Sequence, residues 1–443
     1  MTGLIMAAQL ILGLSILVAL HELGHYLAAR AFGIRVEKFY LFFDAWGFKL
    51  FSFKRGDTEW GIGWLPFGGY VKISGMVDES MDKEQMAQPP QPWEFRSKPA
   101  WQRLIVMIGG VAMNVILGIL IFSASLLVYK GEYLPNSEVK NGIVAYKLGK
   151  QLGLQDGDKI TAIDGKPFER FDDLRTSKVV FGSVLSVNRN GQNVEIVVPD
   201  DFYKRVSAEG QSSFLGTGKL YYDVSLVDEG GSAFLAGLKK GDQIIAINNE
   251  PISAGSDLPK KLSELKGKKV NLSVLRNGEI VEVSPMVNNE GKISVGYTTA
   301  AEIDKSYKMA PITPMLAFSF GTADAWEALV SNIKGLGKIF SGEEKASDSL
   351  QGPIGIAQIY GGTFNWEWFW RITGLLSMVL AFMNMLPIPA LDGGHVIFLT
   401  IEAITRRKFS DQFMERAQVV GMVILLGLMV FAVGNDVWKH ILN

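Results

Sequence analysis

Four apolar stretches divide this chain into parts that suit a bilayer and parts that suit water. The first, Leu4–Leu20, carries no charge, and the second, Leu104–Tyr129, is long enough to cross a hydrocarbon core of roughly 30 Å. A third covers Ile372–Leu391, and a fourth covers Val419–Val433. The fourth is long enough to cross a membrane only if its helix begins near Phe413. The pattern predicts four transmembrane helices. The first is not a signal peptide, because it lacks a basic n-region and no mature-looking polar sequence follows it.

Lysine and arginine residues orient these helices. They gather between the first two apolar stretches and again in the short loop between the third and the fourth. Because cytoplasmic loops are enriched in Lys and Arg, both loops are expected in the cytoplasm. Both termini and the segment 130–365 are then expected outside, in agreement with an even number of spans.

The external segment contains an internal repeat. The sequence "GLQDGDKITAIDGKPF" at 153–168 matches "GLKKGDQIIAINNEPI" at 237–252, and "LSVNRNGQNVEIVV" at 185–198 matches "LSVLRNGEIVEVSP" at 272–285. Alternating apolar residues, a Gly-Asp turn and an Asn-Gly turn predict strands in each copy. The repeated pattern resembles PDZ domains, although a duplicated structural β-domain without a ligand is the alternative.

The other polar segments have weaker signals. Alternating aromatics over 36–72 predict a β-hairpin at the membrane interface. The polar stretch 78–93 reads as a loop, and 314–340 as one or two amphipathic helices on the outer surface. Residues 341–350 read as a flexible connector.

Composition adds limits to this picture. Hydrophobic residues make up 48 % of the 443 residues and charged ones 20 %, as expected for apolar segments alternating with soluble ones. With 44 basic and 45 acidic residues, no global positive field points to a nucleic-acid partner. The chain has no cysteine, so disulfides and thiolate metal sites are excluded.

The candidate chemistry lies in "HELGH", residues 21–25, inside the first apolar stretch. Residues four apart share a helix face, so His21 and His25 can present ring nitrogens to one metal ion. Glu22 is placed to address a metal-bound water, as in the H-E-x-x-H arrangement of zinc hydrolases. Ionisable side chains cost free energy inside a membrane, which favours function over packing histidines.

A zinc hydrolase site needs a third protein ligand. The third apolar stretch offers "NMLPIPALDGGH", 384–395, in which Pro387 and Pro389 must break the helix. Broken helix within a bilayer is tolerated where it is buried or lines a wet cavity. Asp392 is the favoured ligand and His395 the alternative.

Together, "HELGH" and "NMLPIPALDGG" resemble the motifs of the site-2 protease family of intramembrane zinc metalloproteases. The repeats between the second and third spans resemble those of its bacterial branch, which acts in regulating sigma-E. The resemblance covers nearly the whole chain. It implies zinc bound by His21, His25 and Asp392, with Glu22 as the catalytic base.

The same resemblance implies further site residues. Asn384 corresponds to a substrate-binding position ahead of the proline motif, with Pro387 and Pro389 beside it. Gly110 and Asn114 in "GGVAMN" match a Gly-x-x-x-Asn motif of the second span and are assigned to substrate binding as well. Residues 36–75 match a membrane-associated β-sheet, although "FYLFFDAWG" at 39–47 departs from the usual Gly-Phe-Gly turn.

The function expected is hydrolysis of a peptide bond within a membrane-spanning segment. A helical substrate must unwind, so an edge strand of 36–75 could receive it by β-addition and the Asn384 amide could bond its freed backbone. The family suggests a trimmed single-pass anti-sigma factor or remnant signal peptides as substrate. The repeats either restrict the access of bulky substrates or bind peptide termini.

Two other functions compete with this one. A zinc transporter or sensor would need several acidic or histidine residues along the spans, and a membrane-anchored PDZ adaptor would have no use for Glu22.

The expected protein is therefore a polytopic α-helical protein of the bacterial inner membrane, with a membrane-associated β-sheet and two extracytoplasmic β-rich PDZ domains. Its partners are the lipid bilayer and single-pass substrates, its cofactor is Zn²⁺, and the sequence leaves the oligomeric state open. The domains run 1–32 (first span), 33–102 (cytoplasmic sheet and loop), 103–130 (second span), 131–220 and 221–298 (PDZ domains), 299–364 (amphipathic helices and connector), 365–405 (third span) and 413–436 (fourth span).

Overall fold

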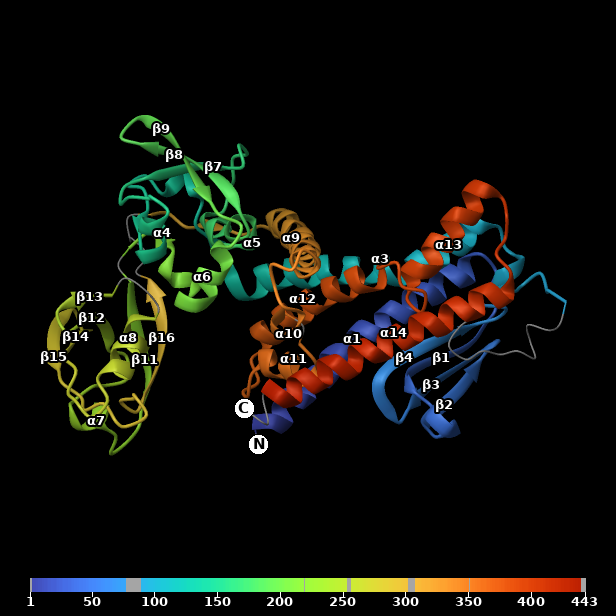
Figure 1. Ribbon diagram of the computed structural model, residues 1–443, viewed down its shortest axis with the longest axis horizontal. Coiled ribbons are helices and arrows are strands. Elements are labelled where there is room, and N and C mark those ends of the chain that lie inside the picture. The colour runs from blue at the N-terminus through green and yellow to red at the C-terminus, as the bar shows by residue number, and fades with distance from the viewer. Residues whose placement is uncertain are drawn as a thin grey trace. The chain divides into compact units, whose positions relative to one another are not determined.

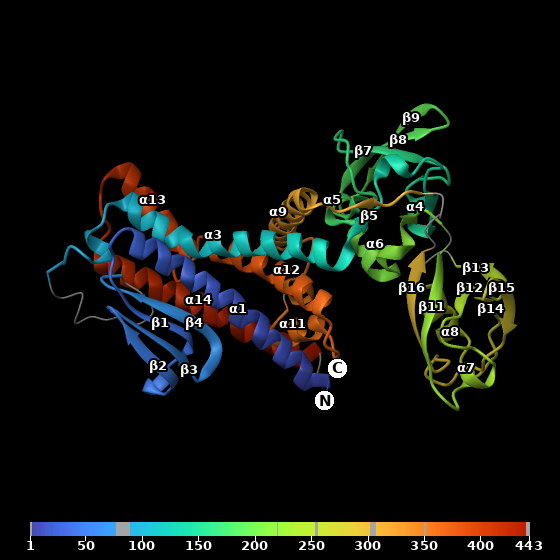
Figure 2. The ribbon, with the colours of Figure 1, turned by 180° about the vertical axis from the view of Figure 1, so that it is seen from behind.

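The computed structural model describes residues 2–76, 89–218, 220–252, 256–301, 307–349 and 351–439 (Figures 1 and 2). The chain forms two compact units, of which one combines Met1–Gly131 with Ile312–Asn443 and the other is Glu132–Pro311. Most of the predicted loop 78–93 lies outside the described residues, and residues 89–93 contain no helix or strand.

Three helices of the described chain are long and apolar enough to cross a membrane. They are α1 (Thr2–Ala31), α3 (Ala100–Ser125, extended by a π-turn to Lys130) and α14 (Asp411–Val437). The third predicted span instead forms two helices, α12 (Trp366–Asn384) and α13 (Asp392–Thr405). The predicted break at the prolines is thus confirmed, whereas a count of four spans stays a prediction.

Glycines let α1 and α3 cross closely. A Cβ added at Gly24 would lie 2.2 Å from the carbonyl oxygen of Gly109, so only glycine fits at this crossing. Helix α3 also packs against α12, α13 and α9 (Pro314–Phe340), whereas the four-stranded sheet packs against α1 (Figure 2).

Residues 36–73 form a four-stranded sheet in the order β2–β3–β1–β4. The predicted hairpin is part of it, but β1 and β3 pair in parallel, which residue alternation alone does not indicate. Strand β4 is an edge strand that packs against α1. Residues 39–47 are the segment that differs from the family's usual Gly-Phe-Gly turn. Within it, Phe42 and Trp46 have left-handed backbone conformations, with φ of 68° and 57°. The strands are β1 (Val36–Phe43), β2 (Lys49–Arg55), β3 (Thr58–Gly63) and β4 (Leu65–Ile73).

The segment before the broken span is more helical than expected. Helix α9 is a single helix, and the predicted connector 341–350 contains the short helix α10 (Ala346–Ser349). Helix α11 (Pro353–Tyr360) follows. The buried carboxylate of Asp436 on α14 accepts hydrogen bonds from three backbone N–H groups at the start of α11 and joins the two helices.

The second unit contains the two copies of the repeat, each around its own apolar core. In the first copy the strands pair in the order β7–β8–β9, and in the second in the equivalent order β12–β14–β15, to which β11 and β16 are added. The first copy has β5 (Glu132–Tyr133), β6 (Val144–Ala145), α4 (Lys147–Gln151), β7 (Lys159–Ile163), α5 (Ser177–Val180), β8 (Ser183–Arg189), β9 (Gln192–Val198), α6 (Phe202–Glu209) and β10 (Leu215–Gly216). The second has β11 (Leu220–Val227), α7 (Ser232–Leu235), β12 (Gln243–Ile247), β13 (Glu250–Pro251), α8 (Asp257–Glu264), β14 (Leu272–Arg276), β15 (Glu279–Val283) and β16 (Val295–Ala301).

The repeated Gly-Asp and Arg-Asn-Gly motifs have one structural explanation. In the first copy Arg189 donates two hydrogen bonds to the Asp158 carboxylate, at 2.8 and 2.7 Å. In the second copy Arg276 binds Asp242 in the same way, at 2.7 Å for both bonds. Each pair links the turn before one strand to the end of the next, so the two motifs recur together.

The expected boundary at residue 298 falls inside β16 and is wrong, because β16 pairs with β11 through Ala301. The chain then returns to the first copy. Strand β17 (Ala310–Pro311) pairs with β5, and Tyr307 packs in the first core. The two ends of this unit are therefore adjacent in space.

Candidate metal centre

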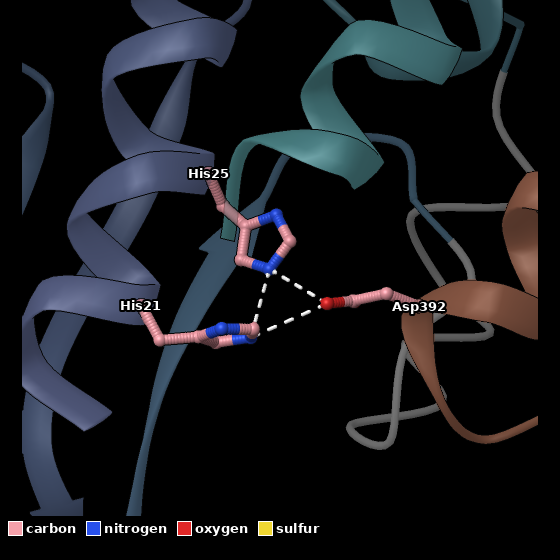
Figure 3. Close-up of side chains that lie close together, drawn as sticks. All are labelled: His21, His25 and Asp392. Carbon is pink, nitrogen blue, oxygen red and sulfur yellow. Dashed lines mark hydrogen bonds and ion pairs between the residues drawn. The ribbon is translucent and has the colours of Figure 1, made fainter. Parts of the chain in front are cut away.

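Helices α1 and α13 bring the three candidate ligands together, and their side chains point toward one another (Figure 3). The Nε2 atoms of His21 and His25 lie 3.2 Å apart. Each lies 3.3 Å from Oδ2 of Asp392. Two donor atoms from one turn of α1 and a third from a distant part of the sequence thus form a nearly equilateral triangle.

The segment between α12 and α13 positions Asp392. Its backbone folds into tight turns, with Leu391 N bonded to Ile388 O and Gly394 N bonded to Leu391 O, both at 3.0 Å. A Cβ at Gly393 would lie 2.3 Å from the carbonyl oxygen of Leu386, so the helix can start here only with glycine. Asp392 is consequently the first residue of α13.

The tautomer of His25 is determined by a backbone group. Its Nδ1 lies 2.8 Å from the carbonyl oxygen of Val106 on α3. A carbonyl can only accept, so Nδ1 carries the proton and Nε2 of the neutral ring keeps its lone pair toward Asp392.

The triangle fits a zinc ion. Zinc bonds of about 2 Å in tetrahedral geometry hold the donor atoms about 3.3 Å apart, close to the separations observed. Oδ2 of Asp392 is buried and has no hydrogen-bond partner among the described residues, as expected for an atom reserved for a metal. Two imidazoles and a carboxylate are also a ligand set that zinc hydrolases use.

Two residues of α3 lie directly against the histidines. A Cβ at Gly110 would lie 2.4 Å from Nε2 of His25 and 2.6 Å from Cε1 of His21, so the imidazole rings occupy the space that a side chain would need. The amide of Asn114, fully buried, lies 3.1 Å from Nδ1 of His21. Both residues contact the candidate ligands, and Asn114 also lines the adjoining cavity, so their expected role in substrate binding stays a prediction.

A cavity of about 670 Å³ adjoins the triangle. Glu22 lines it, as do Asn384 at the end of α12 and the edge strand β4. The Asn384 amide lies 3.4 Å from Nε2 of His21, so it also stands beside the candidate ligands. The remaining lining residues are Val18, Lys38, Phe43, Asp44, Met76, Met107, Asn114, Leu380, Ala390, Leu391, His395 and Gln418, together with β4 residues Gly68, Gly69, Tyr70, Val71, Lys72 and Ile73.

The other sequence candidates are not part of the triangle. His395 borders this cavity and a second one of about 250 Å³, but it is not one of the three converging groups. Pro387 and Pro389 belong to the turns that precede Asp392, and neither is among the described residues that line the cavity.

Several polar groups of the cavity wall were not among the residues expected from the sequence. Asp44 accepts hydrogen bonds from Lys38 at 2.9 Å and from the Tyr70 hydroxyl at 2.8 Å, which joins the segment after β1 to β4. Gln418 on α14 is 5 % exposed, and its Oε1 has no partner among the described residues. Gln418 could have been recognised from the sequence, because a glutamine inside an apolar helix is unusual.

Comparison with known proteins agrees with this geometry. The chain is 28 % identical to a Neisseria meningitidis protein named "Putative zinc metalloprotease", over 97 % of this chain and 98 % of the relative. It is 29 % identical to the regulator of sigma E protease of Haemophilus influenzae, over 96 % of this chain and 97 % of that protein. Metalloprotease MmpA of Caulobacter vibrioides is 27 % identical over 99 % of this chain and 96 % of the relative. The model of peptidase family M50 matches residues 9–428, and the chain therefore belongs to this family of site-2 zinc metalloproteases.

Proposed function

We propose that this metalloprotease cleaves peptide bonds within the membrane-spanning segments of single-pass membrane proteins, with zinc held by His21, His25 and Asp392. The observation that carries the proposal is the triangle of donor atoms, 3.2 to 3.3 Å apart, between two helices of apolar sequence beside a cavity. Zinc, when bound, supplies a Lewis acid that polarises the substrate carbonyl and acidifies water.

Glu22 is the general base and acid of this proposal. It follows His21 directly in α1 and lines the cavity next to the ligands. Its carboxylate takes a proton from the attacking water and then donates it to the amine that leaves when the peptide bond breaks.

The edge strand β4 supports a mode of substrate binding. A helical segment must unwind before its carbonyls are accessible, and its freed backbone groups then need partners. Strand β4 pairs with β1 on one side and lines the cavity with the residues Gly68–Ile73. An extended substrate segment can add to this edge, with Asn384 bonding its backbone from the opposite side.

The proposed topology places residues 33–102 and the loop after α13 in the cytoplasm. It places the unit 132–311 and both termini on the extracytoplasmic side of the inner membrane. It rests on the Lys and Arg distribution. Exposed Trp46, Phe48 and Leu50 beside and on β2 suit a sheet that touches the membrane interface. The external repeats, as PDZ domains, would limit access by substrates with large external parts.

The substrate class proposed is a single-pass protein already trimmed outside, such as an anti-sigma factor, or a remnant signal peptide. The name of the Haemophilus relative, a regulator of sigma E, supports the first. A zinc transporter is the weaker alternative, because within the described residues His21, His25 and Asp392 are the one group of three suitable ligands found.

The chain has no cysteine, which allows a direct test of substrate binding. In a Glu22→Gln background, Lys72→Cys on β4 should form a disulfide with a cysteine near the cleavage site of a model substrate. Lys54→Cys on β2, the opposite edge of the same sheet, is the matched control and should not. Equal cross-linking of both edges, or uncut substrate in membranes with the unmodified enzyme, would contradict the proposal.

A further inference from the structure

We propose that Asn114 is a positioning residue that selects the tautomer of His21. Its side-chain oxygen accepts a hydrogen bond from Nδ1–H of His21, so that Nε2 keeps its lone pair for the metal. This inference rests on the proposed metal centre and reassigns Asn114 from substrate binding to ligand orientation.

The first observation is the contact itself. The Asn114 amide group lies 3.1 Å from Nδ1 of His21, and Asn114 has no exposed surface. In the arrangement shown, Nδ2 faces the imidazole and the buried Oδ1 has no partner in the described part of the chain. A half-turn of the amide about its Cβ–Cγ bond exchanges the two atoms and places Oδ1 where Nδ1–H of His21 can donate to it.

The two amide orientations correspond to two tautomers. When Nδ2 donates to Nδ1 of His21, the proton of the neutral ring is on Nε2 and points toward Asp392, 3.3 Å away. When Oδ1 accepts from Nδ1–H, Nε2 is unprotonated and can bind a metal. An apolar residue at position 114 would stabilise neither tautomer, so the ligand would lose its orientation.

The second observation is the placement of the three α3 groups that touch the histidines. Val106, Gly110 and Asn114 are spaced by four residues and therefore share one face of the helix. The backbone carbonyl of Val106 accepts a hydrogen bond from Nδ1–H of His25, and Gly110 leaves room for both rings. Asn114 completes the row as the side-chain counterpart of the Val106 carbonyl, so α3 fixes both ligands.

Asn114 is itself held in place. The hydroxyl of Ser377 on α12 donates to the backbone carbonyl of Asn114 at 2.7 Å, and Ser377 is fully buried. This contact fixes the backbone of α3 at the point where the amide meets His21, while it leaves the amide free to turn.

The test measures zinc affinity by chelator competition on the purified full-length protein, which does not depend on activity. Asn114→Leu keeps the approximate size but cannot accept a hydrogen bond from Nδ1–H of His21, and it should weaken zinc binding about 10- to 100-fold. Asn114→Asp keeps an acceptor oxygen and should stay within about threefold of wild type or bind more tightly. Ser123→Ala is the control and should leave the affinity unchanged, because the Ser123 hydroxyl, on the same helix, donates to the carbonyl of Ile119 at 2.7 Å and not to a ligand.

Two outcomes would overturn the inference: wild-type affinity in Asn114→Leu, or an equal loss in Asn114→Leu and Asn114→Asp. Failure of the metal centre itself is distinguishable, because His25→Ala and Asp392→Ala would then also retain zinc. If Asn114→Leu does not fold, nitrogen NMR of labelled histidines in the zinc-loaded wild type decides. The chain has four histidines, and His21 must show a protonated Nδ1; a protonated Nε2 would refute the assignment.

Discussion

Nε2 of His25 lies 3.3 Å from Oδ2 of Asp392, although the two residues come from opposite ends of the chain. The contact joins α1 to the first residue of α13 and needs both the closely crossing glycines of α1 and α3 and the tight turns before α13. The metal centre therefore depends on two parts of the fold, and each ligand can be tested by its own substitution.

The first prediction concerns the ligands. His21→Ala, His25→Ala and Asp392→Ala should each lower zinc affinity by more than about 100-fold, beyond the effect of losing a residue that only orients a ligand. His395→Ala is the control and should retain most of the zinc, since His395 lies outside the triangle. Metal analysis of purified variants is the measurement, and full occupancy in Asp392→Ala would refute the assignment.

The second prediction concerns the general base. Glu22→Gln should keep zinc and fold but reduce cleavage of a model transmembrane substrate by about 10²- to 10⁴-fold, because the amide cannot take a proton from water. Turnover and zinc content should be measured on the same preparation. Near-normal turnover in this variant would remove Glu22 from the mechanism.

The third prediction concerns the space around the ligands. Gly110→Ala should weaken zinc binding by about 10-fold or more, because the new methyl group would lie 2.4 Å from Nε2 of His25 and displace the ring. Gly427→Ala is a matched control on α14, where an added Cβ meets no atom within 4 Å. Equal zinc affinity of the two variants would show that the rings can move aside.

The fourth prediction concerns the repeated ion pairs. Arg189→Met should loosen the first copy and Arg276→Met the second, each by about 2 kcal/mol, because a buried carboxylate loses its charged hydrogen-bond donor. Hydrogen exchange of the full-length protein reports both copies at once, so the unaltered copy is the internal control. Equal loosening of both copies by one substitution would contradict independent cores.

The same pairs predict a dependence on pH. Burial acts to raise the pKa of the Asp158 and Asp242 carboxyls, but hydrogen bonds from Arg189 or Arg276 and from a backbone amide outweigh it and leave each pKa below its ordinary value. A carboxyl with a lowered pKa in the folded state stabilises the protein above its ordinary pKa of about 4, and this stabilisation is lost as the pH falls further. Exchange protection, corrected for intrinsic rates, should therefore fall below pH 4 in wild type and less in Asp158→Asn or Asp242→Asn.

The last prediction concerns the external unit. Its two ends are adjacent, since Ile312 N donates to Gly131 O at 2.8 Å, so residues 132–311 can be replaced by a short flexible linker. The deleted enzyme should still cleave a substrate with a short external tail and should gain some cleavage of an untrimmed one, because the proposed barrier is gone. At matched expression, normal short-tail cleavage without any long-tail cleavage would instead favour a peptide-binding role for the repeats.

Local sequence determined the parts of this protein that depend on spacing along one element. The four-residue spacing of His21 and His25 places both on one face of α1, and Pro387 and Pro389 end a helix wherever they occur. The repeated Gly-Asp and Arg-Asn-Gly motifs likewise indicated two similar β-rich copies, because each turn is a local feature.

Tertiary structure decided what depends on contacts between distant elements. Asp392 and His395 are both polar and three residues apart, and only the turns that start α13 at Asp392 bring the carboxylate rather than the imidazole into the triangle. The family resemblance assigns Asn114 to substrate binding, but only the crossing of α1 and α3 at Gly24 turns its face of α3 toward His21 as well. Spacing fixes which residues share a face, but only packing between helices decides what that face meets.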